Sequence, residues 1–141
     1  PLRAVAAVVL LALLLFISAG QIPGYFADQP LEYRAAADWL AQRVGGEASV
    51  MASKPHIAFF SKSRGISFRS HRLQDAGIED IPEILAKANP TYFVYDERYA
   101  AVEFPQFRTL LDPHRNPYPD LLNPVFRTDS PRRLVIYKYE G

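Results

Sequence analysis

The sequence predicts an α/β domain that follows an N-terminal apolar helix. Helix-like and strand-like segments alternate between residues 30 and 111, each strand-like segment is short and apolar, and the last two strand-like segments follow one another with only a turn between them. Alternating helices and strands are typical of a mostly parallel sheet covered by helices, and a closing hairpin adds an antiparallel edge. We therefore expect a small three-layer sandwich with a mostly parallel sheet and an antiparallel C-terminal edge hairpin.

The composition fits one packed domain. The chain has 141 residues, of which 49% are hydrophobic and 22% charged, so a core of ordinary size is expected. It has no cysteine, which excludes disulfides, thiolate metal sites and cysteine nucleophiles. The net charge of +1 does not indicate a nucleic-acid-binding protein, and we expect no nucleic acid among its partners.

The N-terminal segment is apolar throughout. Residues 4–17 contain no polar side chain, and a helix over residues 2–22 would be about 31 Å long, close to the hydrocarbon thickness of a bilayer, about 30 Å. We predict a transmembrane helix and exit segment over residues 1–27 and a soluble domain over residues 28–141. The alternative is a signal peptide, with residues 18–20 as the cleavage site. In both cases Arg3 favours placing residues 28–141 outside the cytoplasm. Because the first residue is Pro and not Met, we expect a fragment or a processed product.

The first helix of the domain is expected over residues 30–44. Pro30 suits the first turn, Glu32 favours the positive end of the helix dipole, and Gly45-Gly46 ends the helix. Apolar residues recur at spacings of three and four and predict one buried stripe. The stripe consists of Leu31, Ala35, Ala36, Trp39, Leu40 and Val44.

The later elements are predicted from the same signals. Strands are expected at residues 48–52, 66–68 and 91–95, and a hairpin at residues 124–128 and 134–139. Helices are expected to begin at Pro55, over residues 78–88 and around residues 103–111. Residues 112–124 contain four prolines and are expected to form a loop.

Motifs for common chemistries are absent from the sequence. Neither nucleotide-binding pattern, GxGxxG or GxxxxGK[ST], occurs in the sequence. The GxSxG motif that carries the nucleophilic serine of α/β-hydrolases is also missing. The three histidines are too far apart to form a local chelate, so we expect no metal site and no cofactor. Asp96-Glu97 follows the strand at residues 91–95, and we interpret it as a cap on the next helix, although such strand ends can also carry functional groups.

The strongest local feature is basic. Residues 51–72 contain five Lys/Arg, two His and no Asp or Glu, whereas the other eleven Lys/Arg stand against fifteen Asp/Glu. One interpretation is an anion or headgroup site in which Lys54 and His56 flank a helix start and the remaining cations extend the positive field. The other is a solvated face whose side-chain stems pack on Phe59, Phe60 and Phe68. The candidate binding residues are Lys54, His56, Lys62, Arg64, Arg69 and Arg72.

Three blocks of the sequence, together with the apolar run, resemble a known family. The blocks are YRAAADWLAQRVGGEASVMASKPHIAFFSKSRGISF, TYFVYDER and RRLVIYKYE. They look like the C-terminal tail of bacterial GT-C type glycosyltransferases of the dolichyl-phosphate-mannose–protein mannosyltransferase superfamily, which includes lipid A aminoarabinose transferases. The resemblance covers nearly the whole chain, and its most specific pieces are Trp39-Leu40, Val50-Met51 with Lys54-Pro55-His56, and the strand at residues 92–96.

The resemblance implies a polytopic parent enzyme that transfers a sugar from a polyprenyl-phosphate carrier outside the bacterial cytoplasmic membrane. In that family the catalytic carboxylate lies in the first extracytoplasmic loop, and no position here corresponds to it, so no catalytic residue is assigned. The chain would then be the last membrane span plus a non-catalytic accessory domain. Its implied partners are the membrane, the rest of the parent enzyme, and a lipid-linked sugar phosphate or the acceptor.

A second hypothesis does not depend on a parent enzyme. The chain would be a free-standing α/β binding module, membrane-anchored or secreted, and residues 51–72 would bind an anion or a partner.

Overall fold

The computed structural model describes residues 30–44 and 46–141. The transmembrane helix and exit segment expected over residues 1–27 lie outside the described residues. Residues 31–141 form one compact unit. Within the described part of the chain, no helix has both the length and the apolar character needed to cross a membrane.

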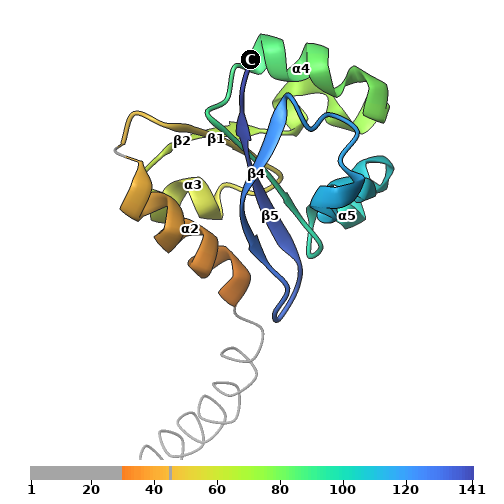
Figure 1. Ribbon diagram of the computed structural model, residues 1–141. Coiled ribbons are helices and arrows are strands. Elements are labelled where there is room, and N and C mark those ends of the chain that lie inside the picture. Colours follow the sequence, from red (N-terminus) through yellow and green to blue (C-terminus); the bar gives the residue numbers. More distant parts are fainter. Residues whose placement is uncertain (1–29, 45) are drawn as a thin grey trace, which may run out of the picture. The chain divides into compact units, whose positions relative to one another are not determined.

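The unit is built on a mixed sheet of five strands in the order β2-β1-β3-β5-β4 (Figure 1). The strands are β1 (Ser49–Ala52), β2 (Arg64–Ser67), β3 (Tyr92–Asp96), β4 (Leu122–Thr128) and β5 (Leu134–Tyr139). β1 pairs in parallel with β2 and β3, whereas β5 is antiparallel to both β3 and β4. The expected hairpin is present, but the sheet is mixed and not mostly parallel. The hairpin adds two antiparallel pairings because β5 lies directly against β3.

Helices pack against both faces of the sheet. Figure 1 shows α2 (Leu31–Arg43) and α3 (His56–Ser61) on one side and α4 (Ile81–Ala88) and α5 (Ala100–Glu103) on the other. Because side chains alternate along a strand, each face contributes to its own apolar cluster. Val50, Val94 and Ile136 join the cluster under α2 and α3, and Met51, Phe93 and Tyr137 join the opposite one. All five residues of β3 are buried, as expected for a central strand covered on both faces.

The buried face of α2 differs from the predicted stripe. Tyr33, Ala36, Ala37 and Leu40 are buried, whereas Leu31 is 54% exposed. Ala35 is also exposed, and Trp39 and Val44 are partly buried. The set at residues 33, 36, 37 and 40 has the same three–four spacing as the predicted one, and in an alanine-rich helix the pattern does not distinguish neighbouring faces. The tyrosine defines the face that packs.

Three other segments differ from the prediction. The helix expected around residues 103–111 is the short α5 followed by a 3₁₀ helix at Pro105–Leu111, where Pro105 lacks the N–H that would continue an α-helix. A 3₁₀ helix at Ile78–Asp80 precedes α4, and β4 begins at Leu122, inside the expected loop. β2 ends at Ser67, and Phe68 leaves the sheet and stacks on Phe93, with 5.1 Å between ring centroids.

Candidate functional site

The carboxyl ends of the three parallel strands meet at one edge of the sheet, and polar side chains gather there. Ser53 and Lys54 follow β1, Arg69 follows β2, and Asp96 is the last residue of β3. In open α/β sheets this edge is where ligands commonly bind. We therefore take it as the candidate functional site.

Asp96 connects β1 to the start of α5. Its carboxylate is 2% exposed and accepts hydrogen bonds from the Ser53 hydroxyl at 3.1 Å and from the Tyr99 N–H at 2.7 Å. The N–H of Ala100 is 3.4 Å from the same carboxylate. These contacts confirm the cap interpretation for Asp96, whereas Glu97 binds Arg133 instead; the Asp96 contacts also hold the β1–α3 loop in place.

Tyr33 on α2 is buried next to this site, with its ring close to those of Tyr99 and His56. Its hydroxyl is buried, and no described residue forms a hydrogen bond with it. Burial raises the pKa of Tyr33 well above its ordinary range, and the charge of nearby Asp96 raises it further. Its ring lies 6.0 Å from that of Tyr99 and 6.2 Å from that of His56, centroid to centroid. The phenol is therefore held protonated and makes mainly packing contacts.

Glu103 at the end of α5 pairs with two cations of the basic segment. It forms an ion pair with Lys54 and a second with Arg69, whose Nη2 lies 3.0 Å from Glu103 Oε2. The hydrogen bond from Lys54 lowers the pKa of the Glu103 carboxyl, and Arg69 lowers it further. The Lys54 ammonium also lies 5.1 Å from the centroid of the Tyr99 ring, a distance suited to a cation–π contact.

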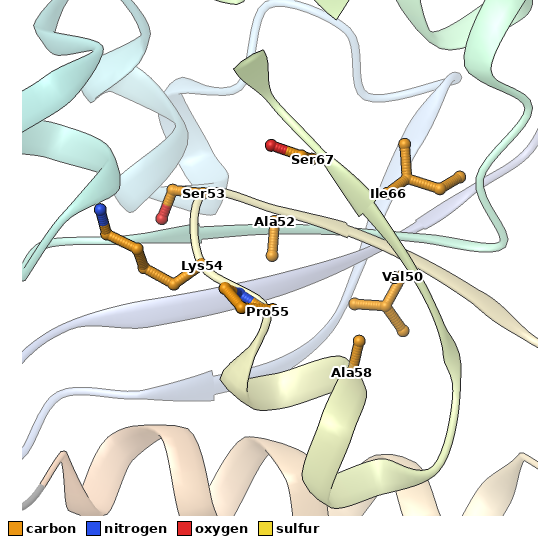
Figure 2. Close-up of a pocket in the computed structure, with 9 residues that line it drawn as sticks. Val50, Ala52, Ser53, Lys54, Pro55, Ala58, Ile66 and Ser67 are labelled. Carbon is orange, nitrogen blue, oxygen red and sulfur yellow. The ribbon is translucent and has the colours of Figure 1, made fainter. Parts of the chain in front are cut away.

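The direction of Lys54 bears on the predicted anion site. Figure 2 shows the Lys54 side chain extending away from α3. Its ammonium binds Glu103 and points away from the start of α3, a helix of only six residues. For Lys54, the contact seen is an internal ion pair.

Two cavities adjoin this edge. One, of about 270 Å³, lies between β1, β2 and α3, with Ala52 and Ala58 on its apolar wall and Ser53 and Ser67 at its polar end (Figure 2). The other, of about 360 Å³, is lined by Arg69, Gln74, Glu103 and Phe104. Both lie near the lower end of the volumes usual for small-molecule sites, roughly 300–1,000 Å³.

The six predicted binding residues do not form one continuous site. Lys54 and Arg69 meet at Glu103, on the edge where the parallel strands end. Lys62 and Arg64 lie at the opposite end of β2, where the strand begins, and both are exposed. β2 has four residues and is about 13 Å long, and the two groups lie at its opposite ends. His56 contacts the Tyr33 ring, and exposed Arg72 connects two 3₁₀ turns in a left-handed conformation with φ of 56°.

Sequence reasoning missed the acidic partners. Glu103 is 49 residues from Lys54 along the chain, and no local pattern indicates the pairing. Glu32 was expected to favour the helix dipole, but its side chain is fully buried and Oε1 lies 2.5 Å from Arg98 Nε. Both contacts depend on how α5 and the β3–α5 loop pack, which spacing within one segment does not reveal.

The described residues contain no group of three or more His, Cys, Asp or Glu side chains that could hold a metal ion. No protein-family model and no curated protein sequence matches the chain.

Proposed function

We propose that the chain is the last membrane span and the extracytoplasmic accessory domain of a polytopic bacterial membrane glycosyltransferase that uses a polyprenyl-phosphate-linked sugar donor. In this proposal residues 31–141, a small three-layer sandwich, perform no catalysis. They cap the membrane-embedded site of the parent enzyme or contact its acceptor. The proposal draws on the family resemblance of the three sequence blocks and on the apolar run at residues 4–17.

The observation that supports the non-catalytic role is that the two carboxylates at the sheet edge are already bound to other groups of the domain. Asp96 is committed to Ser53 and to backbone N–H groups, and Glu103 is committed to Lys54 and Arg69. A general acid or base must reach a substrate proton within hydrogen-bond distance. These carboxylates hold loops together instead, which suits a domain that recognises or shields a substrate.

The proposal is tested by two measurements on transfer from a polyprenyl-phosphate-linked sugar. The 141-residue chain alone, reconstituted in bilayers, should show no turnover; sugar transfer by it would contradict the non-catalytic role. The coding sequence upstream of Pro1 should encode further membrane spans, and removing residues 31–141 from that parent should reduce transfer. An open reading frame that begins just before Pro1 would overturn the parent-enzyme proposal.

The second candidate function is a membrane-anchored or secreted binding module. It is favoured by the exposure of Lys62, Arg64 and Arg72, cations that form no ion pair among the described residues. Such a module would bind an anionic ligand or an acidic partner without any parent enzyme. The upstream coding sequence distinguishes this function from the first.

A further inference from the structure

α3 presents two adjacent phenylalanines to solvent. Phe59 is 77% exposed and Phe60 is 59% exposed, and their ring centroids are 5.4 Å apart in an edge-to-face arrangement. The other exposed large apolar residues among those described, Leu31 and Val102, lie on other helices. Single exposed apolar residues are ordinary on protein surfaces, whereas an adjoining pair of bare aromatic rings indicates a contact surface.

The fold fixes the outward direction of these rings. Ile57, Ala58 and Ser61 on the opposite side of α3 are buried, and Ala58 packs closely on β2. The helix ends at Ser61, and the left-handed backbone of Lys62, with φ of 57°, lets the Ser63 N–H return to the Ala58 carbonyl at 2.9 Å. The two rings therefore project from a short helix that is anchored on its inner side.

Cations surround the end of α3. Lys62 and Arg64 are exposed and form no ion pair with any described residue. Lys62 directly follows α3, and Arg64 opens β2 two residues later. Arg43 stacks on Trp39, 4.5 Å from the ring centroid, so the cations next to the aromatic pair in the chain are Lys62 and Arg64. Exposed aromatic rings bordered by Lys and Arg are typical of surfaces that bind the interface of anionic membranes.

The length of the chain places a membrane within reach. The fully apolar run ends at Ile17, and residues 18–30 separate it from α2. Thirteen residues span at most about 45 Å when extended. If residues 4–17 lie in a bilayer, as the sequence predicts, chain length allows α3 to reach the surface of that bilayer.

We propose that α3 docks on the membrane, with Phe59 and Phe60 entering the boundary between headgroups and acyl chains and Lys62 and Arg64 contacting lipid phosphates. This docking surface is distinct from the edge formed by Lys54, Glu103 and Arg69. Of the six candidate binding residues that the sequence indicated, it uses only Lys62 and Arg64. It holds for a glycosyltransferase domain and for an anchored binding module alike, so its failure would leave both proposed functions standing.

The absence of cysteine allows a direct measurement of depth. In the full chain, Phe60→Cys and, as a matched control, Val102→Cys are labelled with an environment-sensitive fluorophore. Val102 is an apolar residue that is 70% exposed on α5, so its label reports a comparable site off the proposed surface. Both proteins are placed in nanodiscs of phosphatidylcholine with phosphatidylglycerol, where both bilayer faces meet solvent. Lipid-attached and aqueous quenchers are then compared.

The label at position 60 should be quenched several-fold more strongly by the lipid-attached quencher than the label at position 102, and less strongly by the aqueous one. Equal aqueous quenching at the two positions would overturn the proposal. Protection of position 60 from both quenchers would also overturn it, because protein and not lipid would then cover the pair.

A second pair of variants tests the cations. Lys62→Glu combined with Arg64→Glu should return the label at position 60 to water, because anionic lipid repels the reversed charges, and high salt should weaken docking of the unmodified surface. Arg115→Glu combined with Arg132→Glu, also exposed but far along the chain from α3, should leave the depth unchanged. Lipid quenching that is equal in both double variants would show that Lys62 and Arg64 do not contact the headgroups, which overturns that part of the proposal.

Discussion

The hydroxyl of Ser53 donates a hydrogen bond to Asp96 Oδ2 at 3.1 Å, joining the carboxyl ends of β1 and β3 across 43 residues of sequence. Both residues are buried. Asp96 also binds the N–H groups that open α5, so one carboxylate fixes two loops at the edge where an α/β sheet commonly binds ligands. The edge is therefore organised by internal contacts.

Removing the Asp96 carboxylate should destabilise the domain. Asp96→Ala leaves the Ser53 hydroxyl and the Tyr99 N–H without their acceptor, and we expect the free energy of unfolding to fall by about 2 kcal/mol. Trp39, the sole tryptophan, packs edge-to-face on Tyr92 of β3, and its fluorescence can follow urea unfolding. Asp120→Ala, at an exposed position, is the control. Equal stability of the two variants would contradict a structural role for Asp96.

The Lys54–Glu103–Arg69 cluster should make part of the stability depend on pH. Its cations lower the pKa of Glu103 below the ordinary value of 4.5, so the folded state binds fewer protons at this group than the unfolded state. The contribution is present above about pH 4.5 and is lost as the pH falls through the lowered pKa of the folded state. Glu103→Gln should therefore lower stability by no more than about 1 kcal/mol at neutral pH and by progressively less in acid.

Urea unfolding of both proteins across this pH range checks the prediction. A stability difference between them that grows as the pH falls would have the wrong sign and would exclude the proposed ion-pair role. Glu79→Gln, in which an exposed glutamate is replaced, controls for the general effect of removing one negative charge.

The elements that sequence predicted well are those whose signals are local. The first helix, the strand at residues 91–95 and the C-terminal hairpin were each expected within about two residues of their observed bounds, because apolar spacing, β-branched and aromatic residues and prolines mark them. The order of strands was harder. Nothing in the chain around Leu134 indicates that β5 pairs with β3, which gives the sheet its second antiparallel pairing.

The contacts of the candidate site were also hard to predict, because they join segments that are far apart in the sequence. The basic segment was visible as composition, but its division between the two ends of β2 follows from the return of the chain through α3. Glu103 could not be assigned to Lys54 without the packing of α5. Phe59, Phe60 and Phe68 were grouped as packing surfaces for cation stems, yet Phe68 is fully buried and the other two are exposed. Helix phase within the six residues of α3 exposes Phe59 and Phe60, whereas Phe68 is buried because it follows β2 and stacks on Phe93.

The close approach of α3 to β2 should depend on Gly65. A Cβ atom built at Gly65 would lie 3.3 Å from the Cβ of Ala58, so a larger side chain must push the helix away. We expect Gly65→Val to lower the free energy of unfolding by about 1–3 kcal/mol, as overpacking does. Gly46→Ala is the matched control, because its Cβ would meet the Lys62 carbonyl at an ordinary 3.4 Å. If both variants unfold at the same urea concentration, the close packing of α3 on β2 is not a source of stability.

Phe68 and Phe59 should respond in opposite ways to truncation, although they are nine residues apart in the same basic segment. Phe68 is fully buried and stacks on Phe93 with an interplanar angle of 11°, so Phe68→Ala removes a filled core position and should cost about 3–5 kcal/mol. Phe59 is 77% exposed, and Phe59→Ala should change stability by less than about 0.5 kcal/mol. Urea unfolding of both variants in detergent, where no bilayer is available for docking, makes the comparison. A loss at Phe59 as large as that at Phe68 would mean that the ring is covered within the protein, and the membrane-docking surface on α3 would then lose its aromatic pair.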